Sequence, residues 1–299
     1  MKSGNRAEKK RARLREGLGA SAPVLMVGAH DAMSAQLIET YGFDAVWVSG
    51  FGVATMTHAV PDLNLTTMSE VLAASVRIDS ATSLPVVTDC DNGFGGLSNV
   101  VRTVVEFERA GIAGICLEDN LFPKRNSLYS GESKRELIAA AEQARRIRAG
   151  KSAQESDSFV IIARVEALIA GHGVEAACER ADAYAEAGAD AILIHSKDKS
   201  LAEIEGFMTE WKGKGSIPLV AVPTLFPDYT DQELYDKGFQ MVILANHPMR
   251  AAVQAMEQTL QTLQLERKAA AVDPHIASVD HIFELVGTKE AIALEEEGI

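Results

Sequence analysis

The sequence VEAACERADAYAEAGADAILI, residues 174–194, joins a helix to a strand. Residues 174–187 carry apolar side chains at helical spacing, whereas residues 191–194 form a short and continuous apolar run. Gly188 stands between them, where glycine supplies the left-handed residue that ends a helix and turns the chain. The same ending recurs at three other places, Gly42, Gly111 and Gly238. The segment therefore predicts a helix–glycine–strand unit that repeats along the chain.

Eight short apolar runs show that this unit is the repeat of most of the chain. They are residues 24–27, 45–48, 84–88, 114–117, 159–163, 191–194, 219–222 and 241–244. The runs are apolar nearly throughout, which is typical of parallel strands covered by helices. Further helices are expected over residues 34–41, 99–110 and 134–149. The alternation predicts an α/β fold, a (β/α)8 barrel of the TIM type, with an open doubly wound sheet as the alternative.

The two ends of the chain differ from this pattern. Residues 1–20 are rich in lysine and arginine without a long apolar run, which predicts a basic helix lying on an acidic body rather than a secretory signal. Residues 279–286 and 290–297 read as two short helices whose apolar faces need a partner, in the same subunit or a neighbouring one. No Pro/Gly/Ser-rich linker divides the chain, so we expect a single domain over residues 1–299 with a C-terminal helical extension from about 266 to 299.

Composition narrows the class of protein. The 299 residues carry a net charge of −13, which argues against nucleic-acid binding and against a polybasic membrane anchor. No apolar run approaches the roughly 20 residues that a transmembrane helix needs. The three cysteines are widely spaced and contain no CxxC, which fits a reducing cytoplasm. We therefore expect a cytoplasmic protein that binds neither nucleic acid nor a membrane.

Carboxylates gather where the predicted strands end, which is where a barrel of this type carries its active site. Asp89 and Asp91 are two residues apart on an extended segment, so both side chains can face the same side, and Glu118 ends the next strand. Carboxylates so close together repel one another unless a cation lies among them. Ligands that are all oxygen favour Mg2+ or Mn2+. The alternative is that these residues cap the following helices, but the three together favour a metal site.

Cationic and hydroxyl-bearing residues lie opposite this acidic group. Arg164 ends an apolar strand, where a guanidinium is costly unless it meets an anion. It can pair with Glu118 or Glu166, or bind a substrate carboxylate or phosphoryl group. His195 follows another buried run and is either a packing residue or a catalytic one. Residues 120–130 form a long, polar, basic loop that is either a lid or a solvated loop.

Taken together, these residues resemble the phosphoenolpyruvate mutase / isocitrate lyase superfamily over nearly the whole chain. Five motifs match in order and spacing: WVSGF at 47–51, DCDNGFG at 89–95, EDNLFPK at 118–124, ARVEA at 163–167 and LIHS at 193–196. Within the superfamily the sequence is similar to the phosphoenolpyruvate mutase and phosphonopyruvate hydrolase branches. The resemblance implies an Mg2+-dependent enzyme of small phosphorylated or phosphonylated acids.

The resemblance also implies which residues hold the metal and the substrate. Asp89 is expected to bind Mg2+, with Asp91 and Glu118 bound directly or through water. The backbone amides of Ser49, Gly50 and Phe51 are expected to hold the substrate carboxylate and carbonyl. Trp47 is expected to form a wall of the pocket.

Catalytic roles follow from the same resemblance. Asp62 matches the catalytic aspartate of the family, and Arg164 and His195 are expected to contact substrate oxygens near the breaking bond. Three residues are assigned to the gating loop: Lys124, Asn126 and Ser127. The family forms tetramers with exchanged C-terminal helices, so a homotetramer built as a dimer of dimers is expected.

Three reactions are open to such a site. A mutase moves a phosphoryl group between the enol oxygen and the methylene carbon of the same molecule, and a hydrolase releases phosphate from phosphonopyruvate. A carbon–carbon lyase is disfavoured, because the loop lacks the cysteine of the lyases. Phe51 and Pro61 lean towards the hydrolase, whereas Asn126 favours the mutase, since by resemblance the hydrolase carries threonine there. A barrel without catalysis is disfavoured by the intact acidic residues and Arg164.

Overall fold

The computed structural model describes residues 2–129, 135–211, 213 and 217–298. The chain forms two compact units, Met1–Pro248 and Met249–Ile299. The second unit starts before the helical extension expected from about residue 266, because helix α10 (His247–Glu266) follows the eighth strand almost at once. That the chain forms a single domain stays a prediction.

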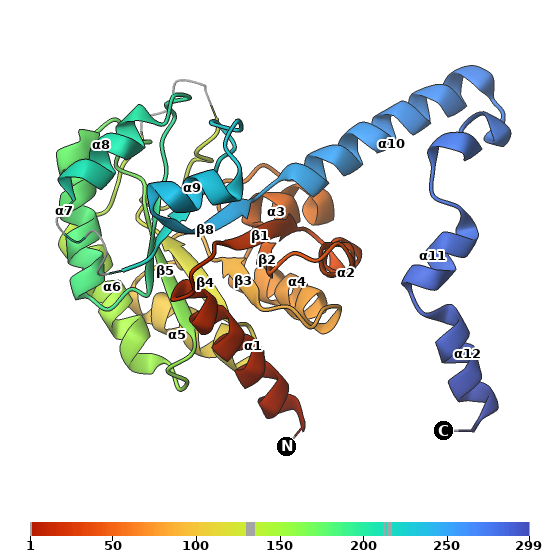
Figure 1. Ribbon diagram of the computed structural model, residues 1–299, viewed down its shortest axis with the longest axis horizontal. Coiled ribbons are helices and arrows are strands. Elements are labelled where there is room, and N and C mark those ends of the chain that lie inside the picture. The colour runs from red at the N-terminus through yellow and green to blue at the C-terminus, as the bar shows by residue number, and fades with distance from the viewer. Residues whose placement is uncertain (1, 130–134, 212, 214–216, 299) are drawn as a thin grey trace. The chain divides into compact units, whose positions relative to one another are not determined.

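The first unit is a closed barrel of eight parallel strands in sequence order, and β1 pairs with β8 to close it (Figure 1). The strands are β1 (Val24–Ala29), β2 (Ala45–Val48), β3 (Val86–Asp89), β4 (Gly114–Glu118), β5 (Val160–Val165), β6 (Ala191–Ile194), β7 (Leu219–Ala221) and β8 (Phe239–Leu244). The predicted (β/α)8 barrel is confirmed, and the open doubly wound sheet is excluded.

Helices surround the strands. They are α2 (Ala32–Thr40), α3 (Gly50–His58), α4 (Met68–Ser80), α5 (Leu97–Arg109), α6 (Ala140–Ala153), α7 (Gly173–Glu186), α8 (Ala202–Glu210) and α9 (Asp231–Lys237). Several begin at side-chain caps, as α4 does at Thr67, which forms a capping box with Glu70. The glycine endings predicted from the sequence are confirmed, since Gly188 and its three counterparts all have positive φ.

Helix α6 begins later than the sequence predicts. The expected start at Lys134 lies outside the described residues, and residues 135–139 are not helical. Leu137 instead forms an isolated antiparallel bridge with Asn120, the residue that follows β4 by two positions. This pairing between two ends of a loop is not local in sequence, so helical periodicity could not reveal it.

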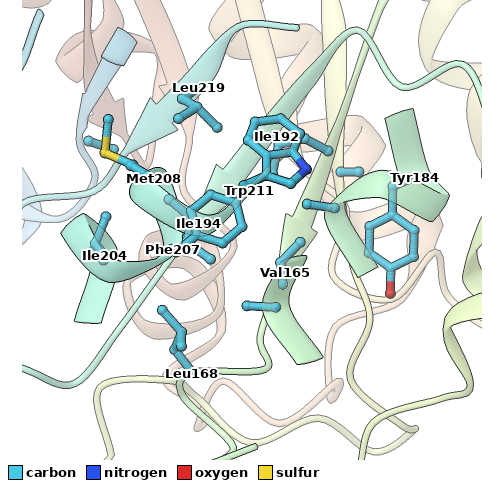
Figure 2. Close-up of a cluster of buried hydrophobic side chains, with 14 of the residues drawn as sticks. Val165, Leu168, Tyr184, Ile192, Ile194, Ile204, Phe207, Met208, Trp211 and Leu219 are labelled. Carbon is cyan, nitrogen blue, oxygen red and sulfur yellow. The ribbon is translucent and has the colours of Figure 1, made fainter. Parts of the chain in front are cut away.

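The core lies in shells between the strands and the helices and inside the barrel. Figure 2 shows one shell, in which Trp211 and Phe207 pack on Ile192 and Ile194 of β6. The interior is filled by alternate strand residues such as Met26 and Ile162. Glycine is required where β1 meets the segment after β8, because a Cβ on Gly28 would lie 2.0 Å from the carbonyl oxygen of Ala245.

Helix α1 (Lys2–Leu18) packs against the strand barrel through one apolar stripe and several cations. Leu14 and Leu18 belong to the cluster that fills the barrel interior. Arg11 donates to the carbonyls of Glu108 and Ile112, just before β4. Arg15 donates to the carbonyl of Phe159 at 2.8 Å and pairs with Asp190 at 2.7 Å. The expected basic N-terminal helix is therefore observed, and its cations bind carbonyls at the starts of the strands.

The second unit is helical throughout most of its length. After α10 come two short 3-10 helices (Ala269–Ala271 and Asp273–His275), then α11 (Val279–Leu285) and α12 (Thr288–Glu296). The two helices predicted at residues 279–286 and 290–297 are thus observed. Large apolar side chains on these helices are exposed, Leu265 by 74% and Val279 by 66%. None of the helices formed by the described residues is long and apolar enough to cross a membrane.

Candidate active site

A cavity of about 60 Å³ lies at the C-terminal ends of the strands. It is lined by most of the residues that the sequence singled out: Trp47, Ser49, Phe51, Asp62, Asp89, Glu118, Lys124, Asn126, Ser127, Arg164 and His195. The two remaining residues lie beside it, because a Cβ on Gly50 would lie 3.3 Å from Asp91 Oδ1 and 3.4 Å from Asp89 Oδ2. The fold therefore brings the predicted residues into one place, as the ends of parallel strands require.

A buried lysine lies among the carboxylates. Lys124 Nζ lies 2.9 Å from Asp62 Oδ1 and also pairs with Asp91 Oδ1. Burial lowers the pKa of Lys124, but the carboxylates of Asp91 and Asp62 outweigh it and hold the pKa well above its ordinary value. Lys124 is therefore charged and neutralises part of the acidic group. Since its side chain is buried, the loop that carries it is not merely solvated.

The acidic residues fit a bound cation. Burial raises the pKa of Glu118 to about 8, against the opposing charges of Lys124 and Arg164, and raises the pKa of Asp91 to about 6. Glu118 Oε1 is buried and has no hydrogen-bond partner among the described residues. A divalent cation would satisfy this oxygen and relieve the repulsion. In the described part of the chain, however, no three His, Cys, Asp or Glu residues are grouped closely enough to hold a metal alone. Water or substrate oxygens would have to complete the coordination.

The start of α3 presents backbone amides at the end of β2. Ser49 caps this helix, and its Oγ accepts from the amide of Gly52 at 3.1 Å. The first amides of a helix, here those of Gly50 and Phe51, have no partner within the helix. Together with the helix dipole they favour an anion at this position. That the amides of the motif at residues 47–51 bind an anionic substrate stays a prediction.

Arg164 joins the strand ends to the lid. Its Nε donates to Glu166 Oε1, its Nη1 lies 3.5 Å from Glu118 Oε2, and its Nη2 donates to Ser127 Oγ at 2.6 Å. Burial lowers the pKa of Arg164, but the charges of Glu166 and Glu118 outweigh it and hold the pKa well above its ordinary value. Both structural partners considered from the sequence are thus present, while the guanidinium still lines the cavity.

Glu166, which was expected only as a partner of Arg164, is held in place through its backbone amide. Its amide donates to Asp119 Oδ1 at 2.9 Å, and Asp119 Oδ2 accepts from Tyr184 Oη at 2.6 Å and from Arg180 at 2.8 Å. These bonds connect β4, β5 and α7 behind the cavity. Glu166, the glutamate of the motif ARVEA, is therefore fixed in place and orients Arg164.

One part of the cavity lining is uncharged, and His195 belongs to it. Burial, with a smaller contribution from Arg164, lowers the pKa of His195 to about 4, so the imidazole is neutral at neutral pH. Within the part of the chain that the structure describes, its buried Nδ1 has no hydrogen-bond partner. The same holds for Thr224 Oγ1 and Asn246 Oδ1, which line the same cavity. Sequence reasoning gave Thr224 and Asn246 no role. Both follow the ends of predicted strands, where side chains were expected to converge, and the structure places them in the cavity lining.

The gating-loop residues contact the barrel directly. Asn126 Nδ2 donates to Asp62 Oδ2 at 2.7 Å. Asn64, which the sequence did not single out, accepts from the Lys124 amide at 2.6 Å and donates to Asp91 Oδ2 at 3.0 Å. Asn64 has a φ of 58°, in the left-handed region that asparagine tolerates. The described part of the loop is therefore docked on the site, and its predicted last residue, Ser130, lies outside the described residues.

Comparison with known proteins agrees with this geometry. Residues 14–264 match the family model described as phosphoenolpyruvate phosphomutase. A phosphoenolpyruvate phosphomutase of Tetrahymena pyriformis is 41% identical over 262 residues, 88% of this chain and 86% of the relative.

Two solved structures are also similar. The crystal structure of a phosphoenolpyruvate phosphomutase from Streptomyces platensis subsp. rosaceus gives a TM-score of 0.92 at 39% identity, covering 96% of this chain and 98% of the other. A phosphonopyruvate hydrolase in complex with oxalate and Mg2+ gives 0.89 at 38% identity, with the same coverage. These similarities confirm the resemblance drawn from the five motifs, and their near-equal identities do not separate the two activities.

Proposed function

Because the chain belongs to the phosphoenolpyruvate phosphomutase family, we propose that it is a phosphoenolpyruvate mutase, an isomerase that interconverts phosphoenolpyruvate and 3-phosphonopyruvate. The observation that carries the proposal is the 2.7 Å hydrogen bond from the Asn126 amide to Asp62. This bond holds Asn126, the residue that favours the mutase, next to Asp62, the aspartate expected to be catalytic. The product would be the first intermediate with a carbon–phosphorus bond in phosphonate biosynthesis.

The residues suit a phosphoryl group in transit. Phosphoryl transfer passes through a loose transition state, so a protein mainly positions groups and stabilises charge. The amides of Gly50 and Phe51 would bind the substrate carboxylate, and Arg164 would donate to the neighbouring oxygens. The neutral imidazole of His195 can donate one N–H hydrogen bond to the substrate. Asn126 would donate to the phosphoryl oxygens from the lid.

A metal fits this arrangement. Asp89 would hold Mg2+, or Mn2+ in its place, with Asp91 and Glu118 bound directly or through water. When bound, the ion would supply Lewis-acid stabilisation of negative charge on the pyruvate oxygens. Lys124 and Arg164 add positive charge on either side of Glu118, which keeps the site attractive to an anionic substrate.

Exclusion of water separates the mutase from its alternative. The side chains of Lys124 and Ser127 are buried and line the cavity, so this loop would lie against a bound substrate and exclude water from it. A phosphoryl group released from carbon would then meet the enol oxygen rather than water. Phosphonopyruvate hydrolysis is the second candidate, favoured by Phe51 in the cavity wall and by Pro61 beside Asp62.

Phosphorus NMR of the protein with Mg2+ and phosphonopyruvate distinguishes the two. A mutase converts the signal of phosphonopyruvate into that of phosphoenolpyruvate, and a hydrolase converts it into inorganic phosphate. Accumulation of phosphate without phosphoenolpyruvate would overturn the mutase.

We further propose a cytoplasmic homotetramer, a dimer of dimers that acts on a small molecule and binds neither nucleic acid nor membrane. The exposed apolar side chains of the second unit, such as Leu265 and Val279, support assembly, because patches of this kind are commonly covered by a partner. Light scattering at micromolar concentration tests the assembly, and a monomer would contradict it.

A further inference from the structure

Arg135 binds three main-chain carbonyls of the loop expected to form the lid. Its Nη1 donates to the carbonyl of Arg125 at 2.8 Å, and its Nη2 donates to those of Asn126 at 2.6 Å and Tyr129 at 3.2 Å. Among the described residues, no carboxylate forms an ion pair with this guanidinium. Bonds to three carbonyls of one loop constrain the loop's backbone and do not depend on its side chains.

The backbone next to Arg135 is itself fixed to the end of β4. The amide of Leu121 donates to the carbonyl of Glu136 at 2.8 Å, and the amide of Ile138 donates to that of Asp119 at 3.0 Å. The arginine therefore projects from a firmly held segment onto the loop residues that carry the side chains of the cavity lining. A fixed donor against a movable set of acceptors is the arrangement of a latch.

We infer that Arg135 is a positioning residue that latches the lid over the active site and thereby limits the access of water to the phosphoryl group. The second half of this inference rests on the proposed function, while the first half does not. Arg135 is not among the residues that line the 60 Å³ cavity. It lines a separate cavity of about 200 Å³ together with Arg125.

The latch acts on the residues expected to decide the reaction. Two of its acceptors belong to Asn126 and to the residue before it, and the next residue is Ser127. Asn126 bonds to Asp62, and Ser127 bonds to Glu166 and Arg164. If the backbone here moves outward, all three of these bonds are lost together. A planar guanidinium can serve several carbonyls at once, which a lysine ammonium on a flexible stem does poorly.

Limited trypsin digestion of the native protein tests the latch without turnover. Cleavage after Lys124 and Arg125, followed by mass spectrometry, reports how often the lid opens. We expect Arg135→Gln to raise this rate about tenfold, the effect of losing hydrogen bonds from a charged donor. Arg135→Lys should raise it by a smaller factor. Arg145→Gln, on the exposed surface of α6 and paired with Glu142, is the matched control and should leave it unchanged.

The outcomes separate the latch from the proposed function. If Arg135→Gln is cleaved at the wild-type rate, the latch is overturned. If Arg135→Lys is cleaved as slowly as the wild-type protein, the latch does not need the shape of the guanidinium. Phosphorus NMR then measures the ratio of phosphate to phosphoenolpyruvate formed from phosphonopyruvate, which should rise about tenfold in Arg135→Gln. A wild-type protein that forms no phosphoenolpyruvate would overturn the proposed function and leave digestion to judge the latch. If Arg135→Gln does not fold, as judged by circular dichroism, Arg135→Lys carries the test.

Discussion

The hydroxyl of Ser127 donates a hydrogen bond to Glu166 Oε2 at 2.7 Å and so joins the lid to the end of β5. Ser127 Oγ also accepts from Arg164 Nη2 at 2.6 Å. Burial raises the pKa of Glu166, but Arg164 outweighs it and holds the pKa below its ordinary value, so Glu166 remains an acceptor at neutral pH. Closing the lid therefore completes the environment of the arginine expected to contact the substrate.

Ser127→Ala removes both hydrogen bonds of the Ser127 hydroxyl without adding bulk. We expect the turnover rate to fall about tenfold, because a hydrogen bond between charged and neutral groups is lost, while KM changes little. Steady-state kinetics measure both. Ser152→Ala, at an exposed position of α6, is the control. Unchanged turnover in Ser127→Ala would show that the contact is incidental.

Asn126→Thr shortens the lid side chain that reaches Asp62. The variant should lose isomerisation and release more phosphate, since a smaller hydroxyl leaves room for water near phosphorus. Asn126→Ala should lower the rate of isomerisation far more than it raises KM, because lid contacts matter mainly during transfer. Product ratios by phosphorus NMR and kinetics provide the readouts. An unchanged product ratio in Asn126→Thr would contradict this role of the amide.

Asp89→Ala should abolish activity while the fold persists. Ligand-linked stability provides a second readout, because Mg2+ that binds the folded state raises the melting temperature. We expect this rise in the wild-type protein and in Asp236→Ala, whose side chain lies on α9 away from the site, but not in Asp89→Ala. Full wild-type activity in excess chelator would remove the metal from the proposal.

His195 provides a test by pH. Its pKa of about 4 lies below the ordinary value of 6.5, so the folded state favours the neutral imidazole. The resulting contribution to the free energy of unfolding is fully present above pH 6.5 and should be lost as the pH falls towards 4. NMR titration of the His195 ring, assigned with His195→Asn, checks the value. A midpoint between about pH 6 and 7, the range of an exposed histidine, would show that the ring is not desolvated as the structure has it.

Two glycine substitutions should have opposite effects on stability. Gly28→Ala places a methyl group against the Ala245 carbonyl, which is backbone and cannot move aside, so we expect a loss of about 3 kcal/mol or more. Gly206→Ala, inside α8, brings its methyl group only to 3.5 Å from Val174 and should stabilise the protein by about 1 kcal/mol. Urea unfolding measures both, and equal effects would contradict the close approach at Gly28.

The barrel could be predicted because its evidence is local. Each apolar run and each glycine such as Gly188 is visible within a few residues. The start of α6 could not be predicted, because it depends on the bridge between Asn120 and Leu137. The helical spacing of apolar residues in the sequence continues through Leu137, although in the structure this residue forms the bridge with Asn120.

The candidate site also contains residues that could be identified from the sequence and residues that could not. Asp89 and Arg164 could be selected because a charged residue at the end of a buried strand requires an explanation. Asn64 could not, because an uncharged polar residue in a loop is common and only its folded contacts give it a role. Thr224 could be placed at the end of a strand from the sequence, but its residue type indicated no role there. Arg135 stood among other basic residues, and nothing in its neighbours indicated which carbonyls it binds.

Helix α1 has a consequence for synthesis of the chain. It is synthesised before the strands of the barrel, yet Arg15 pairs with Asp190, 175 residues later. At about 5–20 residues per second, the helix waits roughly 9–35 seconds before that partner exists. Leu14 and Leu18 have no barrel interior to enter during this time. The basic residues around them therefore also serve to keep an apolar stripe in solution until the last strands of the barrel have been made.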